Sequence, residues 1–421
     1  MDSIPLDYWQ INAADPAALT RLLGLPDLRV VQLECAEWLD RLVLHCVPVA
    51  PTAPCPGCRQ ATARLHQVQR RSVRDLPWSR YTCYLELLVR RFWCPRCRRP
   101  FTEALEAVAP YARLTRRYAA HVVAASRDTP LQQVARREAV GYKVVQRAYY
   151  QAVAADLADQ PPPLVRRVGI DEIALKKGHR DFALVVSDLD AKRVLAVLPD
   201  RAQASLEDYL NSWTDAQRAA VEEVALDLWA PYHGAVGRVL PQARRVADRF
   251  HVMKHLTTAV SDARRTLQRA APAAVRAQLK GCRWLLVKNA ADLSAEEAAA
   301  LAVVYEQAPD LGQVHAWKES FRAIFETAPD RASAAARLQE WRTVVAAQAA
   351  GPLTKFLGTL GNWWEEILNY WPQRTSSGPV EGLNNKLKLI KRRAFGYRNF
   401  EHFRLRVLWE CAGTAHHTIA P

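Results

Sequence analysis

The segment Leu164–Leu175, LVRRVGIDEIAL, has the composition of a buried strand and carries an acid, Asp171. A second strand-like segment, VEEVALDLWAPY (Val221–Tyr232), carries Asp227 shortly before Pro231. An acid beside an apolar strand is costly to bury unless a cation or a metal ion lies close to it. A single Asp at a strand end is more often a cap or turn residue, but two in similar positions indicate a functional site.

Three more runs of the same strand-like character lie in this part of the chain. A helix-like segment, QASLEDYLNSW (203–213), precedes the fourth run. Three strands, one helix, two strands and then further helices fit a ribonuclease-H-like α/β core. We expect the rival acids Asp181, Asp188 and Asp190 to be solvated residues of the second strand or its turn. The five runs are RRVGIDEIAL (166–175), DFALVVSDLD (181–190), RVLAVLPD (193–200), VEEVALDL (221–228) and ARRVADRF (243–250).

A third acid, Glu381, stands near the start of SSGPVEGLNNKLKLIKRRAFGYRNFEHF (Ser376–Phe403). Gly378 is a usable N-cap and Pro379 suits the first helical position, so a helix is expected from about Pro379 to Arg393. Between residues 382 and 400 there are six cations and no acid, which favours a polyanionic partner over a solvated helix of mixed charge. The polar face of this helix would carry Glu381, Asn384, Asn385, Lys388 and Arg392.

Three acids suit a metal-dependent nuclease, because two divalent ions about 4 Å apart must be held together. The segments around these acids resemble bacterial insertion-sequence transposases with a DDE triad, most closely the ISL-three (ISL3) family. The resemblance covers nearly the whole chain. Its strongest elements are GIDEIALKKGH around Asp171, ALDLWAPY around Asp227, ADRFHVMKHL around Asp248, and the Ser376–Phe403 segment.

This resemblance implies that Asp171, Asp227 and Glu381 form the catalytic triad and hold two Mg²⁺ or Mn²⁺ ions. Water would then cleave at the ends of the element, and the freed 3′ hydroxyl would attack target DNA. The DRFH segment resembles an acid-x-x-His signature, so Asp248 and His251 are expected to support the site without binding metal directly. The residues expected to contact DNA around this site are Lys176, Lys177, Trp284, Asn384, Lys388, Lys391, Arg392 and Arg393. For Trp284, a place in a hydrophobic core is an equally good alternative.

Four of the nine cysteines occur in two pairs, CPGC (Cys55, Cys58) and CPRC (Cys94, Cys97). Each pair can present two thiolates to one tetrahedral zinc ion, and residues 59–93 are enough for a hairpin between the pairs. A redox pair or simple buried thiols are the alternatives. Residues 55–101 contain eleven Arg and two acids, which suits DNA phosphates. The unpaired residues Cys35, Cys46, Cys83, Cys282 and Cys411 are expected to be small core residues.

Three helix-like segments follow, RRYAAHVVAAS, DTPLQQVARREAVG and YKVVQRAYYQAVAAD. Thr129, Pro130 and Gln132 suggest a capping box at the start of the second segment. We expect a helix-turn-helix whose third helix begins near Tyr142 and presents Lys143, Gln146 and Arg147 to the major groove. Three short helices are also a common structural unit, so the DNA-binding interpretation depends partly on the neighbouring zinc module.

Composition supports a nucleic-acid partner, because 58 Lys and Arg against 43 Asp and Glu give a net charge of +15. We see no signal peptide and no apolar run of membrane-spanning length, so a cytoplasmic protein with no membrane partner is expected. The expected domains are an N-terminal region with the zinc module (1–104), the helix-turn-helix and its linker (105–163), the first part of the core (164–251), an all-helical insertion (252–370), and the catalytic helix with the rest of the core (371–421).

The sequence thus predicts a DNA transposase that binds terminal inverted repeats and target DNA, with one structural zinc and two catalytic Mg²⁺ or Mn²⁺ ions. A homodimer is expected, because two element ends must be brought together in one synaptic complex. Two alternatives stay open. One is a ribonuclease-H-like, structure-specific endonuclease that cuts branched DNA without strand transfer, and the other is a non-catalytic zinc and helix-turn-helix regulator.

Overall fold

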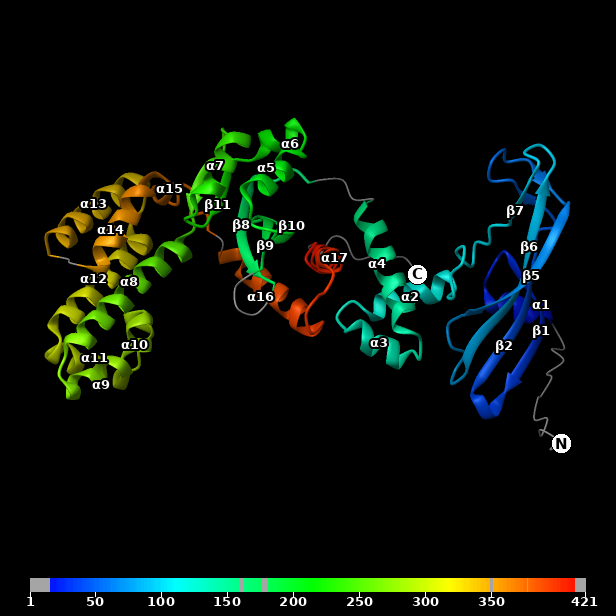
Figure 1. The fold of residues 1–421 in the computed structure, drawn as a ribbon, viewed down its shortest axis with the longest axis horizontal. Helices are drawn as coiled ribbons and strands as arrows, with labels where there is room; N and C mark the ends of the chain where they lie inside the picture. Colours follow the sequence, from blue (N-terminus) through cyan, green and yellow to red (C-terminus); the bar gives the residue numbers. More distant parts are fainter. Residues whose placement is uncertain (1–15, 159–162, 176–180, 349–350, 377, 413–421) are drawn as a thin grey trace. The chain divides into compact units, whose positions relative to one another are not determined.

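The computed structural model describes residues 16–158, 163–175, 181–348, 351–376 and 378–412 (Figure 1). These residues fall into two compact units, which are separated between residues 158 and 163 and are described one at a time. Within the described residues, no helix is both long enough and apolar enough to cross a membrane.

The first unit contains a five-stranded sheet in the order β1-β2-β6-β5, with β7 paired to β6. Strands β2 and β6 run parallel, and the other neighbours are antiparallel. Leu28, Leu44 and Leu85 are buried in one core with Leu23 of α1. A separate pair, β3 and β4, lies beside the cysteines. The elements are α1 (Pro16–Leu23), β1 (Leu28–Ala36), a 3-10 turn (Glu37–Leu39), β2 (Arg41–Pro48), β3 (Ala53–Pro54), β4 (Ala61–Thr62), β5 (Leu65–Arg74), β6 (Thr82–Cys94) and β7 (Arg99–Thr102).

Three helices complete this unit: α2 (Arg116–Ala125), α3 (Leu131–Arg137) and α4 (Tyr142–Ala158). A fully buried carboxylate, Asp75, attaches α2 to the end of β5. It accepts hydrogen bonds from Thr115 Oγ1 at 2.6 Å and from Arg117 Nε at 2.8 Å. Because a buried charge is stable only when it is paired, this contact fixes the start of the helical group on the sheet.

The second unit is built on a mixed sheet in the order β10-β9-β8-β11-β12. Neighbours β10, β9 and β8 are antiparallel, whereas β11 runs parallel to both β8 and β12. All five strand-like runs of the sequence are confirmed as strands. Their bounds are β8 (Arg167–Ala174), β9 (Phe182–Asp188), β10 (Arg193–Leu198), β11 (Glu223–Leu226) and β12 (Arg244–Ala247).

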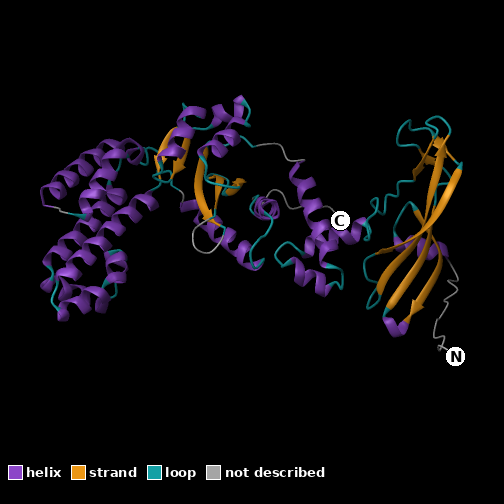
Figure 2. Cartoon of the chain, in the orientation of Figure 1, coloured by secondary structure: helices purple, strands orange, loops and turns teal. Residues whose placement is uncertain are grey.

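Helices cover both faces of this sheet (Figure 2). Val168 and Ile170 of β8 are buried with α5 (Gln203–Asn211) and α7 (Ala230–Val239), and α6 (Asp215–Ala220) lies between these helices in sequence. Ile173 faces the opposite side and packs with α16 (Gly378–Arg393) and α17 (Phe400–Glu410). Because side chains alternate along a strand, Asp171 belongs to the face covered by α16.

A group of helices lies between β12 and α16, and the regular elements described at 252–370 are all helical (Figure 2). Phe321, Phe325, Trp341 and Phe356 make ring contacts in its core. The expected domain boundary at residue 251 falls inside the first helix, which Asp248 caps. The elements are α8 (Arg249–Ala270), α9 (Ala273–Gly281), α10 (Arg283–Val287), a 3-10 turn (Ala290–Asp292), α11 (Ala295–Gln307), α12 (Pro309–Thr327), α13 (Arg331–Gln348), α14 (Pro352–Asn362) and α15 (Trp364–Leu368).

Candidate active site and DNA-binding modules

Asp171 lies on β8, the central strand of the second sheet, and is half-buried. Its Oδ1 accepts a hydrogen bond from the backbone N–H of Glu172 at 2.7 Å. Its Oδ2 accepts one from Asn384 Nδ2 at 2.6 Å. The carboxylate is therefore held between its own strand and α16.

Asp227 follows β11 directly, and the strand register relates it to Asp171. Ala225 is paired with Gly169 in the parallel ladder between β11 and β8. Two residues further on, Asp227 and Asp171 share the same parity along neighbouring parallel strands, so both belong to the sheet face covered by α16. Asp227 Oδ1 accepts a hydrogen bond from Leu228 N at 2.6 Å, and its side chain is 33% exposed.

Helix α16, which carries the third expected acid in its sequence, packs on this face of the sheet. The helix begins at Gly378, one residue before the expected start, and ends at Arg393 as expected. Leu383 packs against Ala225 of β11 and Leu189, while the Asn384 amide binds Asp171. Glu381 lies in the same helix, three residues before Asn384, so both start from one helical face. The placement of the Glu381 side chain lies outside what the structure describes.

The cations of α16 divide into two groups. Lys388 and Arg392 are exposed. In contrast, Lys391 Nζ donates to the carbonyl of Ala174 at 2.6 Å, and Arg393 Nη2 donates to Glu410 Oε2 at 2.5 Å. The contacts of Lys391 and Arg393 therefore stabilise the core around α16. Lys176 and Lys177 lie outside the described residues.

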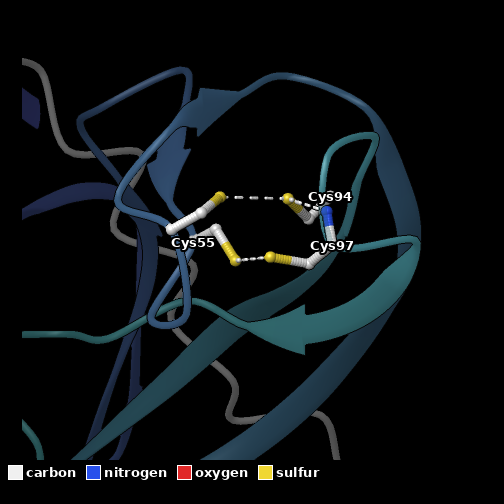
Figure 3. Close-up of side chains that lie close together, drawn as sticks. Cys55, Cys94 and Cys97 are labelled. Carbon is white, nitrogen blue, oxygen red and sulfur yellow. Dashed lines mark hydrogen bonds between the residues drawn. The ribbon is translucent and has the colours of Figure 1, made fainter.

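The four paired cysteines converge at the end of the first sheet (Figure 3). Cys55 follows β3 and Cys94 ends β6, so the β5–β6 hairpin joins the two knuckles. The four Sγ atoms all lie within 4.8 Å of one another. Within the described residues, this is the one group of three or more potential ligands that is close enough to hold a metal ion.

The two knuckles have matching backbone geometry. Arg59 and Arg98, each directly after the second cysteine of its pair, have φ values of +60° and +51°. A Cβ at Gly57 would lie 2.5 Å from the Arg99 guanidinium and 3.5 Å from Cys97 Sγ, so a larger side chain there would require the Arg99 side chain to move. Residues other than glycine rarely adopt positive φ, so a repeated turn of this kind indicates a built metal site.

The thiols of the cluster differ in acidity. Burial would raise the pKa of Cys55, but hydrogen bonds from the backbone N–H groups of Cys58 and Gly57 lower it to about 6. Hydrogen bonding with Cys58, together with burial, raises the pKa of Cys97 to about 12. A zinc ion bound here would hold all four sulfurs as thiolates and balance their charge.

Helices α2, α3 and α4 have the order and lengths of a helix-turn-helix. The third helix begins at Tyr142, as expected, and buries Val145, Tyr149 and Val153. Lys143 and Arg147 are exposed one turn apart, and Gln146 is half-buried. The expected capping box is wrong, because α3 begins at Leu131 with Pro130 at its N-cap and no side-chain cap.

Comparison with known families decides what this combination of modules represents. Residues 168–407, more than half of the chain, match a family described as Transposase. The chain belongs to the ISL3 family of transposases. Residues 51–97 match the zinc-finger of transposase IS204/IS1001/IS1096/IS1165. Residues 103–153 match the helix-turn-helix domain of transposase family ISL3.

Curated relatives agree with this assignment. The transposase is 28% identical over 393 residues to the transposase for insertion sequence element IS1001 of Bordetella parapertussis, and the alignment covers 91% of this chain and 96% of the relative. It is also 27% identical over 258 residues to the transposase for insertion sequence element IS1557 of Mycobacterium tuberculosis, which covers 56% and 57% of the two chains. The zinc-ribbon match and the cysteine cluster together support a structural zinc.

In this transposase, His251 joins the two aspartates that follow β11 and β12. Its Nδ1 lies 3.1 Å from Asp248 Oδ2, and its Nε2 lies 3.7 Å from Asp227 Oδ2. Burial alone would lower the pKa of His251. The hydrogen bond with Asp248 and the charges of Asp227, Asp248 and Asp171 outweigh burial and raise it. The imidazole thus links the carboxylates of Asp227 and Asp248.

The rival acids behave differently from expectation in one respect. Asp188 is a turn residue, as expected, because its Oδ1 accepts hydrogen bonds from Asp190 N at 3.1 Å and Ala191 N at 3.0 Å. The expectation that it is solvated is wrong, since it is only 3% exposed. Its other oxygen pairs with Arg193 at 3.0 Å. Asp188 therefore fixes the β9–β10 turn.

Trp284 is not a core residue. It lies on α10 with 66% of its surface exposed, and the Arg283 guanidinium carbon lies 4.7 Å from its ring centroid. Trp371 is buried and Trp363 and Trp364 pack against the same helical core, as expected for packing residues. The alternative of a core Trp284 is therefore wrong, and its indole is accessible.

Sequence reasoning missed a second polar cluster behind the aspartates. Glu172, on the opposite face of β8 from Asp171, accepts a hydrogen bond from Tyr232 Oη at 2.6 Å. His233 Nε2 lies 3.0 Å from the backbone oxygen of Asp227, and burial lowers the pKa of His233 to about 4. The WAPYH segment contains Tyr232 and His233, but its composition does not reveal that α7 places them against Glu172 and the backbone of Asp227.

Proposed function

We propose that this transposase binds the terminal inverted repeats of an insertion sequence and catalyses metal-dependent DNA cleavage and strand transfer. Asp171, Asp227 and Glu381 would be the catalytic triad. The observation that carries the proposal is the 2.6 Å hydrogen bond from Asn384 to Asp171. It attaches α16 to the central strand within one helical turn of Glu381, although 213 positions separate Asn384 from Asp171 in the sequence.

The fold of the core supports the same proposal. The order β10-β9-β8-β11-β12, with three antiparallel strands followed by two parallel ones, is the arrangement that we assign as ribonuclease-H-like. Its first strand carries Asp171, its fourth is followed by Asp227, and a later helix carries Glu381. The helices between β12 and α16 are then an insertion into this core, which accounts for the long gap between Asp227 and Glu381.

The donor set fits Mg²⁺ or Mn²⁺, because both ions prefer carboxylate oxygens. The side chain of Asp227 is one-third exposed and Asp171 is half-buried, so their oxygens are open to ligands. Asp171, Asp227 and Glu381 would hold two such ions. When bound, the ions supply Lewis-acid activation of the attacking oxygen and stabilise the charge on the leaving oxygen.

The other residues of the site would orient these carboxylates and the DNA. Asn384 holds one oxygen of Asp171, and His251 links Asp227 to Asp248. Lys388 and Arg392 project from the same helix into solvent, where they can bind phosphates of the duplex. Lys391 and Arg393 are left out of this direct role, because each is bound within the protein.

Recognition of the element ends is assigned to the first unit. Lys143, Gln146 and Arg147 would read bases from α4, and the arginine-rich zinc module would bind phosphates next to them. One zinc ion per chain would hold this module, through Cys55, Cys58, Cys94 and Cys97. Two copies of the chain would bring the two ends together in a synaptic complex.

Strand transfer distinguishes this proposal from its alternatives. Pre-cut element ends are incubated with the wild-type protein, a target plasmid and Mg²⁺. Joined molecules are expected from a transposase of this kind. Cutting of branched DNA without joining would instead identify a structure-specific endonuclease, and binding without any cutting would identify a regulator.

A further inference from the structure

A cavity of about 400 Å³ lies at the C-terminal end of β8, beside the turn that joins α16 to α17. Its walls include the half-buried rings of Phe182, Tyr397 and Phe400, with the buried ring of Phe403 behind them. The ring centroids of Tyr397 and Phe403 are 5.3 Å apart, and those of Phe400 and Phe403 are 6.4 Å apart. The pocket is thus an aromatic-walled space within the usual range for small planar ligands, roughly 300–1,000 Å³.

The same pocket has a charged rim. Arg201, Lys391 and Arg398 line it together with two acids, Asp181 and Asp200. Because Lys391 is bound to the Ala174 carbonyl, Arg201 and Arg398 are the cations that can meet a phosphate. The guanidinium carbon of Arg201 lies 5.0 Å from the ring centroid of Phe182. Aromatic faces that stack on a base, next to cations that bind its phosphate, are the combination found in sites for unpaired nucleotides.

Phe395 belongs to the turn between α16 and α17, two residues before the pocket residue Tyr397. Its side chain is 96% exposed, and its backbone has a φ of +54°. The turn is rigidly bonded, since Phe395 N donates to Arg392 O at 2.9 Å and Gly396 N donates to Lys391 O at 3.0 Å. The turn therefore holds the backbone of an exposed apolar residue that lies between Arg392 and Arg398 in the sequence. An exposed apolar side chain on a fixed turn is suited to enter a base stack as a wedge.

We propose that Phe395 inserts into the DNA duplex near the cleavage site and that the aromatic pocket receives the base displaced from the stack. The inference rests on the proposed function, because that function places DNA over Asp171. Leu175 on the pocket wall is four positions after Asp171, directly after β8, which is roughly 13 Å of extended chain. For a DNA strand that follows β8, about 3.4 Å per nucleotide puts the displaced base about four positions from the scissile phosphate.

Each half of this device has an ordinary explanation when taken alone. Single exposed aromatic residues are common, and a cavity can be a defect of packing. The two together are specific, because displacing a base from a duplex requires both a side chain to fill the gap and a place for the base. Here one hydrogen-bonded turn supplies the wedge and part of the pocket wall.

Fluorescence of 2-aminopurine tests the inference directly, because this base is quenched in a stack and brightens when it leaves it. The probe is a duplex of the terminal repeat read from the DNA flanking the gene, with 2-aminopurine placed in turn at six positions on each side of the cleavage site. The protein is full-length Asp171→Asn, which should bind the end without cutting it. We expect a brightening of at least threefold at one position about four nucleotides from the cleavage site.

Variants then assign the signal to this site. Phe395→Ala should abolish the brightening while leaving end affinity within threefold of the parent. Phe400→Leu, which keeps an apolar side chain in the core but removes a stacking ring, should reduce it at least twofold. Leu389→Ala changes an exposed apolar residue of the preceding helix α16, and Trp38→Ala changes an exposed aromatic residue of the other unit; neither should change the signal. An abasic nucleotide at the bright position should restore cleavage by Phe395→Ala in the otherwise wild-type protein.

The outcomes separate this inference from the proposed function. A wild-type protein that binds ends without joining them, while Asp171→Asn still brightens the probe, would contradict the proposed function and leave the wedge and pocket standing. Bound DNA that brightens at none of the twelve positions would overturn the wedge and pocket, as would a Phe395→Ala signal equal to that of the parent. Either of these two fluorescence results would overturn the inference even if the wild-type protein joins DNA.

Discussion

Replacing Asn384 by Ala tests how α16 is attached to the catalytic strand. The change removes the donor that lies 2.6 Å from Asp171 Oδ2. A hydrogen bond to a charged group contributes about 1.5–3 kcal/mol. If all of that free energy orients the carboxylate in the transition state, the rate of strand transfer should fall roughly 10- to 150-fold.

Binding and folding should change much less. Asn384 is half-buried on the helix, and Ala has the higher helix propensity by several tenths of a kcal/mol, which offsets part of the lost bond. Asn385→Ala is the matched control, because Asn385 is exposed at the next position of the same helix. The assay is single-turnover joining of pre-cut ends, with end affinity measured on the same preparations.

Two results would refute this reasoning. One is an Asn384→Ala protein that joins ends as fast as the wild type. The other is an equal loss in Asn384→Ala and Asn385→Ala, which would mean that any change to the polar face of α16 is harmful and that the contact with Asp171 has no special role.

Four further predictions concern the rest of the molecule. Metal analysis of the purified protein should find about one zinc per chain, and Cys94→Ser should lose the metal and weaken end binding, whereas a metal-free wild type would rule out the site. Arg147→Ala should reduce the preference for the terminal repeat more than the affinity for random duplex, and both affinities should fall steeply with salt; equal losses would exclude base reading by Arg147. Asp188→Asn should lower the free energy of unfolding by about 1–3 kcal/mol, because the Arg193 guanidinium would lose the buried carboxylate with which it pairs. An unchanged urea midpoint would contradict this. Burial lowers the pKa of His315 to about 4, so its neutral form is favoured in the fold and its contribution to stability should fall by up to about 1.4 kcal/mol per pH unit from pH 6.5 toward 4. His233 has a similarly lowered pKa, so His315→Gln should make the slope in urea titrations shallower by that amount and leave the contribution of His233; an unchanged slope would contradict this.

The strands and helices of the core could be predicted because their signal is local. Alternating or continuous apolar residues mark β8 to β12, and glycine and proline mark the start and end of α16. The cysteine spacing likewise identified the four thiols that the structure brings within 4.8 Å. Each strand and helix is decided by residues of its own short segment, and each cysteine pair is recognised by two cysteines three positions apart.

Features that depend on distant partners could not be predicted. The sheet of the first unit pairs β2 with β6 across about forty residues, and no local pattern encodes that pairing. Asp188 was assigned to solvent because the sequence does not show that Arg193 and the turn would bury it. The burial of Trp284 was equally open, since a tryptophan on a short amphipathic helix can face either way until its neighbours are placed.

The contact between α16 and the strand that carries Asp171 could be predicted from the sequence only in part. The helical period placed Glu381 and Asn384 on one face, but nothing in the sequence indicated that the Asn384 amide would bind Asp171. Glu172, Tyr232 and His233 were missed for the same reason, because their contacts join β8 to α7 through tertiary packing.

The central claim is that three acids from distant parts of the chain act as one catalytic site. The most direct measurement is joining of pre-cut element ends to a target plasmid in Mg²⁺ by Asp171→Asn, Asp227→Asn and Glu381→Gln, each compared with the wild type at equal end occupancy. The account predicts that each variant binds ends nearly as well as the wild type and forms no joined product, and that double variants are no worse than single ones. Full strand transfer by Glu381→Gln would contradict it.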